Sequence, residues 1–163
     1  MVEDLVMRDV RAEDVDTMVG IAVAAWAPVF ACWRELMGEE LFAAVNPNWE
    51  AEKARQVRDA CTADWGTVCV AELAGRVVGF ITWSANGQSG VGEIGNNAVA
   101  PEFQGQGIGP TMYGHVFDRM RELGMRFVKV CTGGDPAHAP ARRAYEKSGF
   151  SICLPGVEYY RRL

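Results

Sequence analysis

The sequence is poor in the residues that build metal sites and disulfide scaffolds. It holds only two histidines and five cysteines in 163 residues, and no two cysteines form a Cys-x-x-Cys pair. The spacing matches no zinc site, so we expect no metal. An odd number of cysteines in apolar surroundings indicates reduced, mostly buried thiols in a cytoplasmic protein.

The sequence also lacks a basic excess, a basic leader and a membrane-length apolar run. Its net charge of −5 argues against a nucleic-acid partner. The first ten residues are acidic and contain no apolar leader core. No apolar run approaches the roughly 18 residues of a membrane span. We therefore expect a soluble, cytoplasmic protein that binds neither nucleic acid nor a membrane.

The remaining composition fits one globular domain over residues 1–163. Hydrophobic residues make up 49% of the chain, which is enough to bury a core without metal or disulfides. Hydrophobic periodicity predicts the order β-α-α-β-β-β-α-β-α-β, without repeats or linkers. Residues 91–131 form a β-α-β unit with parallel strands, whereas the strands before them look like antiparallel hairpins. The fold class is therefore α/β (α+β in some schemes), with a mixed sheet.

Two helices are predicted from apolar residues at helical spacing. The first carries Val15, Met18, Val19, Ala22 and Trp26 on one face. The second carries Ile108, Met112, Val116, Met120 and Leu123 on one face. Pro28 ends or bends the first helix, and Gly124 caps the second.

Further elements follow from turn signals and changes of period. Helical segments are expected over residues 38–45 and 49–61, and a short helix that stops at Gly149. A turn at Ala74-Gly75 joins two strands between residues 67 and 84. Residues 151–163 are expected to supply one or two final strands.

Three glycines, Gly105, Gly107 and Gly109, lie between a predicted strand and a predicted helix. Such a place presents backbone N–H groups and a helix dipole to an anion. A nucleotide-triphosphate loop needs a Gly-Lys dipeptide, which the sequence lacks. A dinucleotide loop needs a third glycine where this chain has Pro110 or Met112. The glycines alone leave open a turn without any ligand.

Two motifs resemble the GNAT superfamily of acyl-CoA-dependent N-acetyltransferases. "AVAPEFQGQGIG" (residues 98–109) looks like the family's V-x-P-x-x-Q/R-x-x-G-x-G run, and "ARRAYEKSGF" (residues 141–150) looks like its A-x-x-x-Y-x-x-x-G-F helix end. The resemblance implies a mostly antiparallel central sheet splayed between two parallel strands, with helices on both faces. It also implies acetyl-CoA as co-substrate, with its pantetheine arm between the strands that end near Val99 and Cys131.

The resemblance assigns roles residue by residue. In the family, loop amides hold the coenzyme's pyrophosphate, strand backbone groups align the thioester, and the helix tyrosine protonates the leaving thiolate. The coenzyme-binding residues implied here are Ala98, Val99, Gln104, Gly105, Gln106, Gly107, Ile108, Gly109, Thr111, His138, Ala141 and Tyr145. Pro110 departs from the family pattern because it removes one N–H donor, for which the Thr111 hydroxyl would compensate.

Two residues are the candidate catalytic groups. Tyr145 is the candidate general acid, and packing alone is its alternative role. Glu93 resembles the base glutamate that some members carry on this strand, and a solvent-facing carboxylate is its alternative. His138 stands where many relatives have an asparagine that contacts the coenzyme.

The acceptor side carries weaker signals. Trp26, Phe30, Trp33 and Asn97 are candidate substrate-binding residues, although aromatics at helical spacing are more often core. Arg142, Arg143 and Lys147 either meet the nucleotide's 3′-phosphate or form a solvated face. The sequence leaves open whether the acceptor is a small-molecule amine, a peptide or a protein, and whether the chain forms a homodimer.

Two functions remain at this point. The first is an N-acetyltransferase that transfers acetyl to a primary amine by direct attack in a ternary complex. The second is a non-catalytic acyl-CoA-binding or sensing module on the same fold. Glu93 and Tyr145 favour the enzyme, because a pure binder does not need a general acid.

Overall fold

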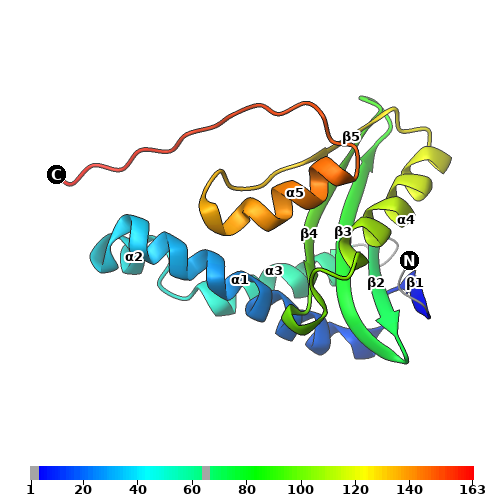
Figure 1. The fold of residues 1–163 in the computed structure, drawn as a ribbon, viewed down its shortest axis with the longest axis horizontal. Helices are drawn as coiled ribbons and strands as arrows, with labels where there is room; N and C mark the ends of the chain where they lie inside the picture. Colours follow the sequence, from blue (N-terminus) through cyan, green and yellow to red (C-terminus); the bar gives the residue numbers. More distant parts are fainter. Residues whose placement is uncertain (1–3, 64–66) are drawn as a thin grey trace.

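One five-stranded sheet organises the molecule (Figure 1). The computed structural model describes residues 4–63 and 67–163. The strands lie in the order β1-β2-β3-β4-β5. They are β1 (Leu5–Asp9), β2 (Val68–Leu73), β3 (Arg76–Asn86), β4 (Val91–Val99) and β5 (Phe127–Val130). All neighbours pair antiparallel except β4 and β5, which are parallel. The predicted mixed, mostly antiparallel sheet is confirmed.

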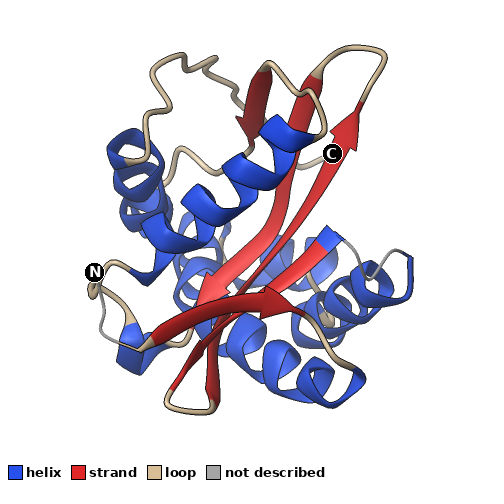
Figure 2. Ribbon diagram, turned by 90° about the vertical axis from the view of Figure 1, so that its right-hand side faces the viewer, coloured by secondary structure: helices blue, strands red, loops and turns tan. Residues whose placement is uncertain are grey.

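Helices cover both faces of this sheet (Figure 2). They are α1 (Val15–Met37), α2 (Glu39–Val45), α3 (Trp49–Ala63), α4 (Ile108–Glu122) and α5 (Ala139–Lys147), with 3-10 turns at Ala12–Asp14, Pro101–Phe103 and Pro136–His138. One core joins α1 and α3 to the sheet through residues such as Met18, Val57 and Phe80. The other joins α4 and α5 to the opposite face through Ile81, Met112 and Tyr145. Both cores depend on β2, whose residues from Val68 to Ala71 are buried on alternate faces.

The hairpin of β2 and β3 turns as predicted. Ala74 and Gly75 both have positive φ, at 48° and 77°. A two-residue turn with positive φ at both positions matches the right-handed twist of the strands that it joins. A glycine reaches this conformation without a steric penalty. The dipeptide therefore fixes the register of the hairpin.

The first helix does not end at Pro28. α1 continues through this proline to Met37, so the expectation of a helix end there was wrong. A proline in a helix interior costs about 3 kcal/mol, because it lacks an N–H and its ring crowds the preceding turn. Packing of Val29 and Phe30, both at most 8% exposed, offsets part of this cost.

The continuation also changes the membrane expectation. Among the described residues, the helical stretch Ala12–Met37 is long and apolar enough to cross a membrane by length and composition. A helix that ended at Pro28, as expected from the sequence, would be shorter than a membrane span. A core helix of a soluble protein passes the same criterion, and α1 packs against α3 and the sheet.

The apolar face of α4 is shorter than predicted. Ile108, Met112, Val116 and Met120 are buried, but Leu123 is 58% exposed. The helix ends at Glu122, and Gly124 follows with a φ of 77°. The N–H of Met125 then bonds the Met120 carbonyl at 3.0 Å. This left-handed cap turns the chain before Leu123 reaches the core.

The predicted final strands are absent. Residues 148–163 contain no strand, and every residue from 151 to 163 is exposed. This segment extends past α5 toward α2, where Arg162 pairs with Glu40 (Figure 1). The apolar residues Ile152, Leu154 and Val157 are more than 80% exposed. They have the composition of a strand without a partner strand beside them in the described chain.

The cysteines are less buried than expected. All five are free thiols, as predicted, but only Cys61 and Cys69 are buried. Cys131 and Cys153 are exposed, because one follows the end of β5 and the other lies in the extended C-terminal segment. Burial raises the pKa of Cys69 to about 11, which keeps this thiol protonated and unreactive.

Candidate coenzyme and acceptor site

The strands β4 and β5 pair only along the first half of β4. They pair from Val91 opposite Phe127 to Ile94 opposite Val130, and pairing then stops although β4 continues to Val99. At the same level β4 bulges, because Gly95 and Asn96 together face one residue of β3. A Cβ at Gly95 would lie 2.6 Å from the Thr82 hydroxyl, so the bulge needs a glycine there. The part of β4 beyond Ile94 therefore has one edge without a partner strand among the described residues.

A pocket of about 860 Å³ occupies this opening. Its walls come from α1, from β4, from the glycine loop with the start of α4, and from the segment around α5. A volume in this range suits a small-molecule ligand. We call the side formed by β4 residues 93–99 and Tyr145 the strand wall. The side formed by Trp26, Pro28 and the turn 133–138, of which Ala137 and His138 line the pocket, is the helix wall.

The glycine loop lies at one end of the pocket and presents free amides. Gly105 and Gly107 have φ of 77° and 87°, a conformation that favours glycine. α4 begins at Ile108, so the N–H groups of Ile108 and Gly109 have no partner within the helix. Pro110 has no N–H, and Thr111 N–H bonds the Gly107 carbonyl at 3.2 Å. Two adjacent amides and the helix dipole thus remain for an anion.

Most of the predicted coenzyme residues lie on the pocket wall. These are Ala98, Val99, Gln104, Gly105, Gly107, Ile108, Gly109, His138, Ala141 and Tyr145. Gln106 and Thr111 do not line it. The Gln106 amide donates to the Glu102 carbonyl at 3.4 Å, and the Thr111 hydroxyl donates to the Gly107 carbonyl at 3.2 Å. The compensation of Pro110 by Thr111 stays a prediction.

Backbone groups of the strand wall face the opening. The N–H of Ala100 donates to the Val78 carbonyl on β3 at 2.8 Å. Because N–H directions alternate along a strand, the N–H of Val99 points to the opposite side, where β5 no longer pairs. The Val99 carbonyl on the same side accepts a bond from Gln104 at 3.0 Å. The Val99 N–H is thus placed to donate to a carbonyl oxygen in the pocket.

Tyr145 joins the strand wall through Asn97. The Asn97 amide donates to the Tyr145 hydroxyl at 3.4 Å, and the Tyr113 hydroxyl donates to Asn97 Oδ1 at 2.9 Å. Tyr145 accepts in this bond, so its own proton stays available. Burial raises the pKa of Tyr145 above its usual value, although the bonds with Asn97 and Tyr113 partly offset this. The phenol is therefore protonated at neutral pH.

Glu93 lies where the pocket meets solvent. Its carboxylate pairs with Lys129 on β5 at 2.9 Å, and its side chain is 44% exposed. The hydrogen bond to Glu93 raises the pKa of Lys129. The Glu93 carboxylate is therefore already engaged by Lys129.

The helix wall holds a buried pair, Asp135 and His138. His138 Nδ1 lies 2.6 Å from Asp135 Oδ2, and the two side chains are 8% and 11% exposed. The backbone N–H of His138 donates to Asp135 Oδ1 at 3.2 Å, and Trp33 Nε1 donates to Oδ2 at 3.2 Å. Desolvation raises the pKa of Asp135, but the bonds from Trp33 and His138 outweigh it and hold the pKa below the usual value.

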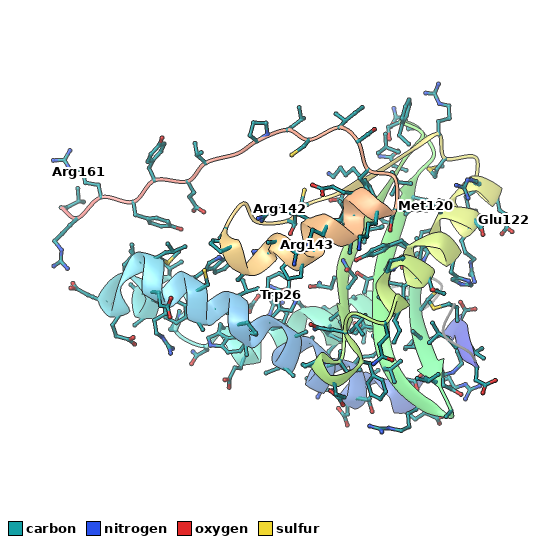
Figure 3. All side chains as sticks on the ribbon, in the orientation of Figure 1. Trp26, Met120, Glu122, Arg142, Arg143 and Arg161 are labelled. Carbon is teal, nitrogen blue, oxygen red and sulfur yellow. The ribbon has the colours of Figure 1, made fainter. Side chains whose placement is uncertain are left out.

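Aromatic residues surround this pair, and Trp26 reaches the pocket (Figure 3). The rings of Trp26 and Trp33 lie 5.7 and 6.0 Å from that of His138, and Trp26 lies between α1 and α5. Phe30 does not line the pocket; it is 8% exposed and stacks on Trp49 at 4.3 Å. Trp33 also stays off the pocket wall and contributes through Asp135.

Lys53 supports the helix wall from behind. Its Nζ lies 3.7 Å from the ring centroid of Trp26 and donates to Asn96 at 3.3 Å. The residue is only 6% exposed, and burial lowers the pKa of Lys53 to about 8. Burial penalises the charged form of Lys53, and the contact with the Trp26 ring offsets part of that penalty.

The two arginines of α5 have different surroundings (Figure 3). Arg142 donates to the carbonyls of Gly133 and Asp135 at 2.6 and 2.8 Å, and so fixes the turn 133–138. Arg143 and Lys147 line the pocket. Across the described ranges, His, Cys, Asp and Glu side chains form no group of three that could hold a metal ion.

Sequence reasoning missed Asp135, Tyr113 and Lys53. Asp135 precedes His138 by three residues, a spacing that could have suggested the pair. Tyr113 follows the loop by one helical turn and could have been placed beside Tyr145. No local signal marks Lys53, because α3 meets β4 only in the folded chain.

Comparisons with known proteins agree with this geometry. The model of the acetyltransferase (GNAT) family matches residues 13–150. The chain is 26% identical over 163 residues to the mycothiol acetyltransferase of Propionibacterium freudenreichii subsp. shermanii, covering 96% of this chain and 46% of that protein. It is 31% identical over 140 residues to the mycothiol acetyltransferase of Saccharomonospora viridis, covering 74% and 45%. The chain thus spans less than half the length of these relatives.

A solved structure shares the fold. The PaiA N-acetyltransferase of Thermoplasma acidophilum, in complex with coenzyme A, superposes with a TM-score of 0.66 at 17% identity, over 91% of this chain and 90% of that one. At this identity the likeness speaks for the fold. The family match covers most of the chain and includes both motifs and the pocket between them. The chain therefore belongs to the GNAT family of acetyltransferases.

Proposed function

We propose that this protein is an acetyl-CoA-dependent N-acetyltransferase that transfers acetyl to a primary amine by direct attack in a ternary complex. One observation carries the proposal. The free amides of the glycine loop, the open edge of β4 and the buried hydroxyl of Tyr145 line one continuous pocket. The loop amides suit the pyrophosphate of the coenzyme, the open strand edge suits its thioester arm, and the Tyr145 hydroxyl suits the leaving thiolate. These three groups follow one another in the same order along the coenzyme.

The transfer has three requirements, and the pocket offers a group for each. The N–H of Val99 is placed to stabilise the oxyanion of the tetrahedral intermediate. Tyr145 supplies the proton to the leaving sulfur. An alkylammonium has a pKa near ~10, so a base must remove a proton from the amine. Glu93 and His138 are the two candidates on the pocket wall.

The acceptor proposed is a small-molecule amine rather than a peptide or protein. The relatives reported above are named mycothiol acetyltransferases, which supports a small-molecule acceptor. The acceptor would lie against the helix wall, where Trp26 and Pro28 are accessible. Pro28 leaves the Ala24 carbonyl without a helical partner, and both residues line the pocket. This carbonyl can accept a hydrogen bond from an amine.

The proposal places the enzyme in the cytoplasm. All five cysteines are free, which suits a reducing compartment. No nucleic acid or membrane takes part in the reaction. A homodimer is compatible with the proposal, because the pocket lies within one chain.

The test is the release of coenzyme A thiol from acetyl-CoA with a panel of amines. The panel contains amino sugars, polyamines, amino acids and short peptides at matched concentration. Turnover with at least one small-molecule amine, and product acetylated on nitrogen by mass spectrometry, is expected. Tight acetyl-CoA binding without turnover on any acceptor would instead support the acyl-CoA-binding or sensing module.

A further inference from the structure

We propose that His138, oriented by Asp135, is the general base that takes the proton from the acceptor amine. This inference rests on the proposed function and adds a catalytic residue to it. The family resemblance had placed His138 only at a coenzyme-contacting position. The tautomer, the accessibility and the support of this one imidazole point to that role.

Asp135 determines which nitrogen of His138 carries the proton. The carboxylate is ionised and lies 2.6 Å from Nδ1. An ionised carboxylate only accepts hydrogen bonds, so Nδ1 must be the donor. The lone pair of the neutral ring is then on Nε2. This is the arrangement by which a carboxylate prepares a histidine for general-base catalysis.

The second ring nitrogen is accessible from the pocket. No hydrogen-bond partner of Nε2 is present among residues 4–63 and 67–163, and His138 lines the pocket. Fully enclosed side-chain atoms without a partner occur elsewhere in these ranges, including Nε2 of His115, but Nε2 of His138 is not one of them. The two histidines therefore differ: His115 is enclosed on α4, and His138 offers a basic nitrogen to the acceptor side.

The surrounding chain holds the pair in one geometry. A Cβ at Gly133 would lie 2.4 Å from both Asp135 Oδ2 and His138 Nδ1, so only glycine leaves room for their hydrogen bond. Arg142 binds the carbonyls of Gly133 and Asp135. Trp33 donates to the same carboxylate oxygen as His138. Such support is what a base needs to keep its lone pair directed at the substrate.

Nε2 of His138 takes one proton from the ammonium, and the neutral nitrogen then forms a bond with the thioester carbonyl carbon while the carbonyl π electrons move to oxygen. When this tetrahedral intermediate collapses, the C–S bond breaks and the sulfur takes the proton of Tyr145. The amide nitrogen loses its second proton through water, which returns a proton to the Tyr145 phenolate, and His138 releases its own proton to water. The net reaction converts an alkylammonium and acetyl-CoA into an amide, a free thiol and one proton.

The test compares His138→Asn and Asp135→Asn with the wild-type chain on an acceptor that the wild type acetylates. We expect kcat to fall by roughly 10²–10⁴-fold in both variants, with the acetyl-CoA Kd from calorimetry unchanged. His138→Asn keeps a polar side chain of similar reach, and thermal unfolding checks its fold. A variant that keeps kcat but loses acetyl-CoA affinity would overturn the inference and make His138 a coenzyme contact.

Two further measurements separate a base from a structural residue. The loss of kcat in His138→Asn should be smaller with weakly basic acceptors, because a more acidic ammonium loses its proton to water without a base. Added imidazole should partly restore kcat in His138→Gly by filling the space between Trp26 and Trp33. If the loss of kcat is the same for all acceptors and imidazole does not restore kcat, the inference is overturned. Turnover by the wild type would still support the proposed function in that case. A wild type that binds acetyl-CoA but acetylates nothing would overturn both.

Discussion

The two walls of the pocket differ in how they hold their polar groups. On the strand wall, Glu93 is half exposed and neutralised by Lys129, and the backbone of β4 offers its own N–H groups. On the helix wall, Asp135 and His138 are almost wholly buried, and Lys53 lies behind them in a desolvated position. The strand wall follows the family motif, whereas the helix wall depends on contacts between distant segments. The strand wall thus rests on a local sequence motif, and the helix wall rests on tertiary contacts.

Within the strand wall, the largest effect is expected at Tyr145. Tyr145→Phe should lower kcat by about 10²-fold, near the lower limit for general-acid catalysis, because a thiolate is already a fair leaving group. Acetyl-CoA affinity should be unchanged in calorimetry. The matched control is Tyr113→Phe, which removes the neighbouring hydroxyl that bonds Asn97 and Tyr145. Equal losses in the two variants would mean that the cluster acts by positioning alone.

The buried lysine of the helix wall should appear in the pH dependence of stability. The pKa of Lys53 is about 8 in the folded chain, against 10.5 for an ordinary lysine. The unfolded chain therefore binds more protons between these values, and Lys53 makes the fold more stable as the pH rises through this window. In urea unfolding from pH 8 to pH 10, the free energy of unfolding of the wild type should rise relative to that of Lys53→Met.

Lys129 on β5, the partner of Glu93, gives the opposite sign and serves as the control. Its pKa is raised by Glu93, so its contribution is present below the ordinary lysine pKa and is lost as the pH rises through the folded value. At high pH, the free energy of unfolding of the wild type should therefore fall relative to that of Lys129→Met. Parallel curves for Lys53→Met and the wild type would contradict the desolvated state of Lys53.

Pro28 should show a trade between stability and acceptor binding. Pro28→Ala restores a helical N–H and should raise the free energy of unfolding by about 1–3 kcal/mol. The restored bond occupies the Ala24 carbonyl, so the acceptor KM should rise. Pro140→Ala is the control for stability, because Pro140 lies in the first turn of α5, where proline is tolerated. A gain in stability without any change in KM would remove Ala24 from the acceptor site.

Glu93 should give the smallest effect. In Glu93→Gln we expect kcat to change by less than about threefold, because the Glu93 carboxylate is paired with Lys129 and half exposed while His138 serves as the base. Glu122→Gln, at the exposed end of α4 (Figure 3), is the matched control for the loss of one charge. A loss of 10²-fold or more in Glu93→Gln would return the base role to the strand wall.

Local sequence patterns predicted an element correctly where that element depends only on residues close together in the chain. The Ala74-Gly75 turn and the four buried residues of α4 follow from short-range rules. The prediction failed at Pro28 and in residues 151–163. In the first case, packing of α1 overrode a local breaker. In the second, a strand-like composition found no partner strand in the described chain.

The sequence by itself determined the loop, the helix that follows it and the tyrosine some forty residues later, because glycine conformations and helical spacing are local properties. Tertiary structure decided the proton chemistry. Whether Glu93 or His138 is a base depends on burial and on partners such as Trp33 and Lys129, which lie up to about a hundred residues away in the chain. Desolvation and charge pairing act through space, so no reading of local spacing could supply them.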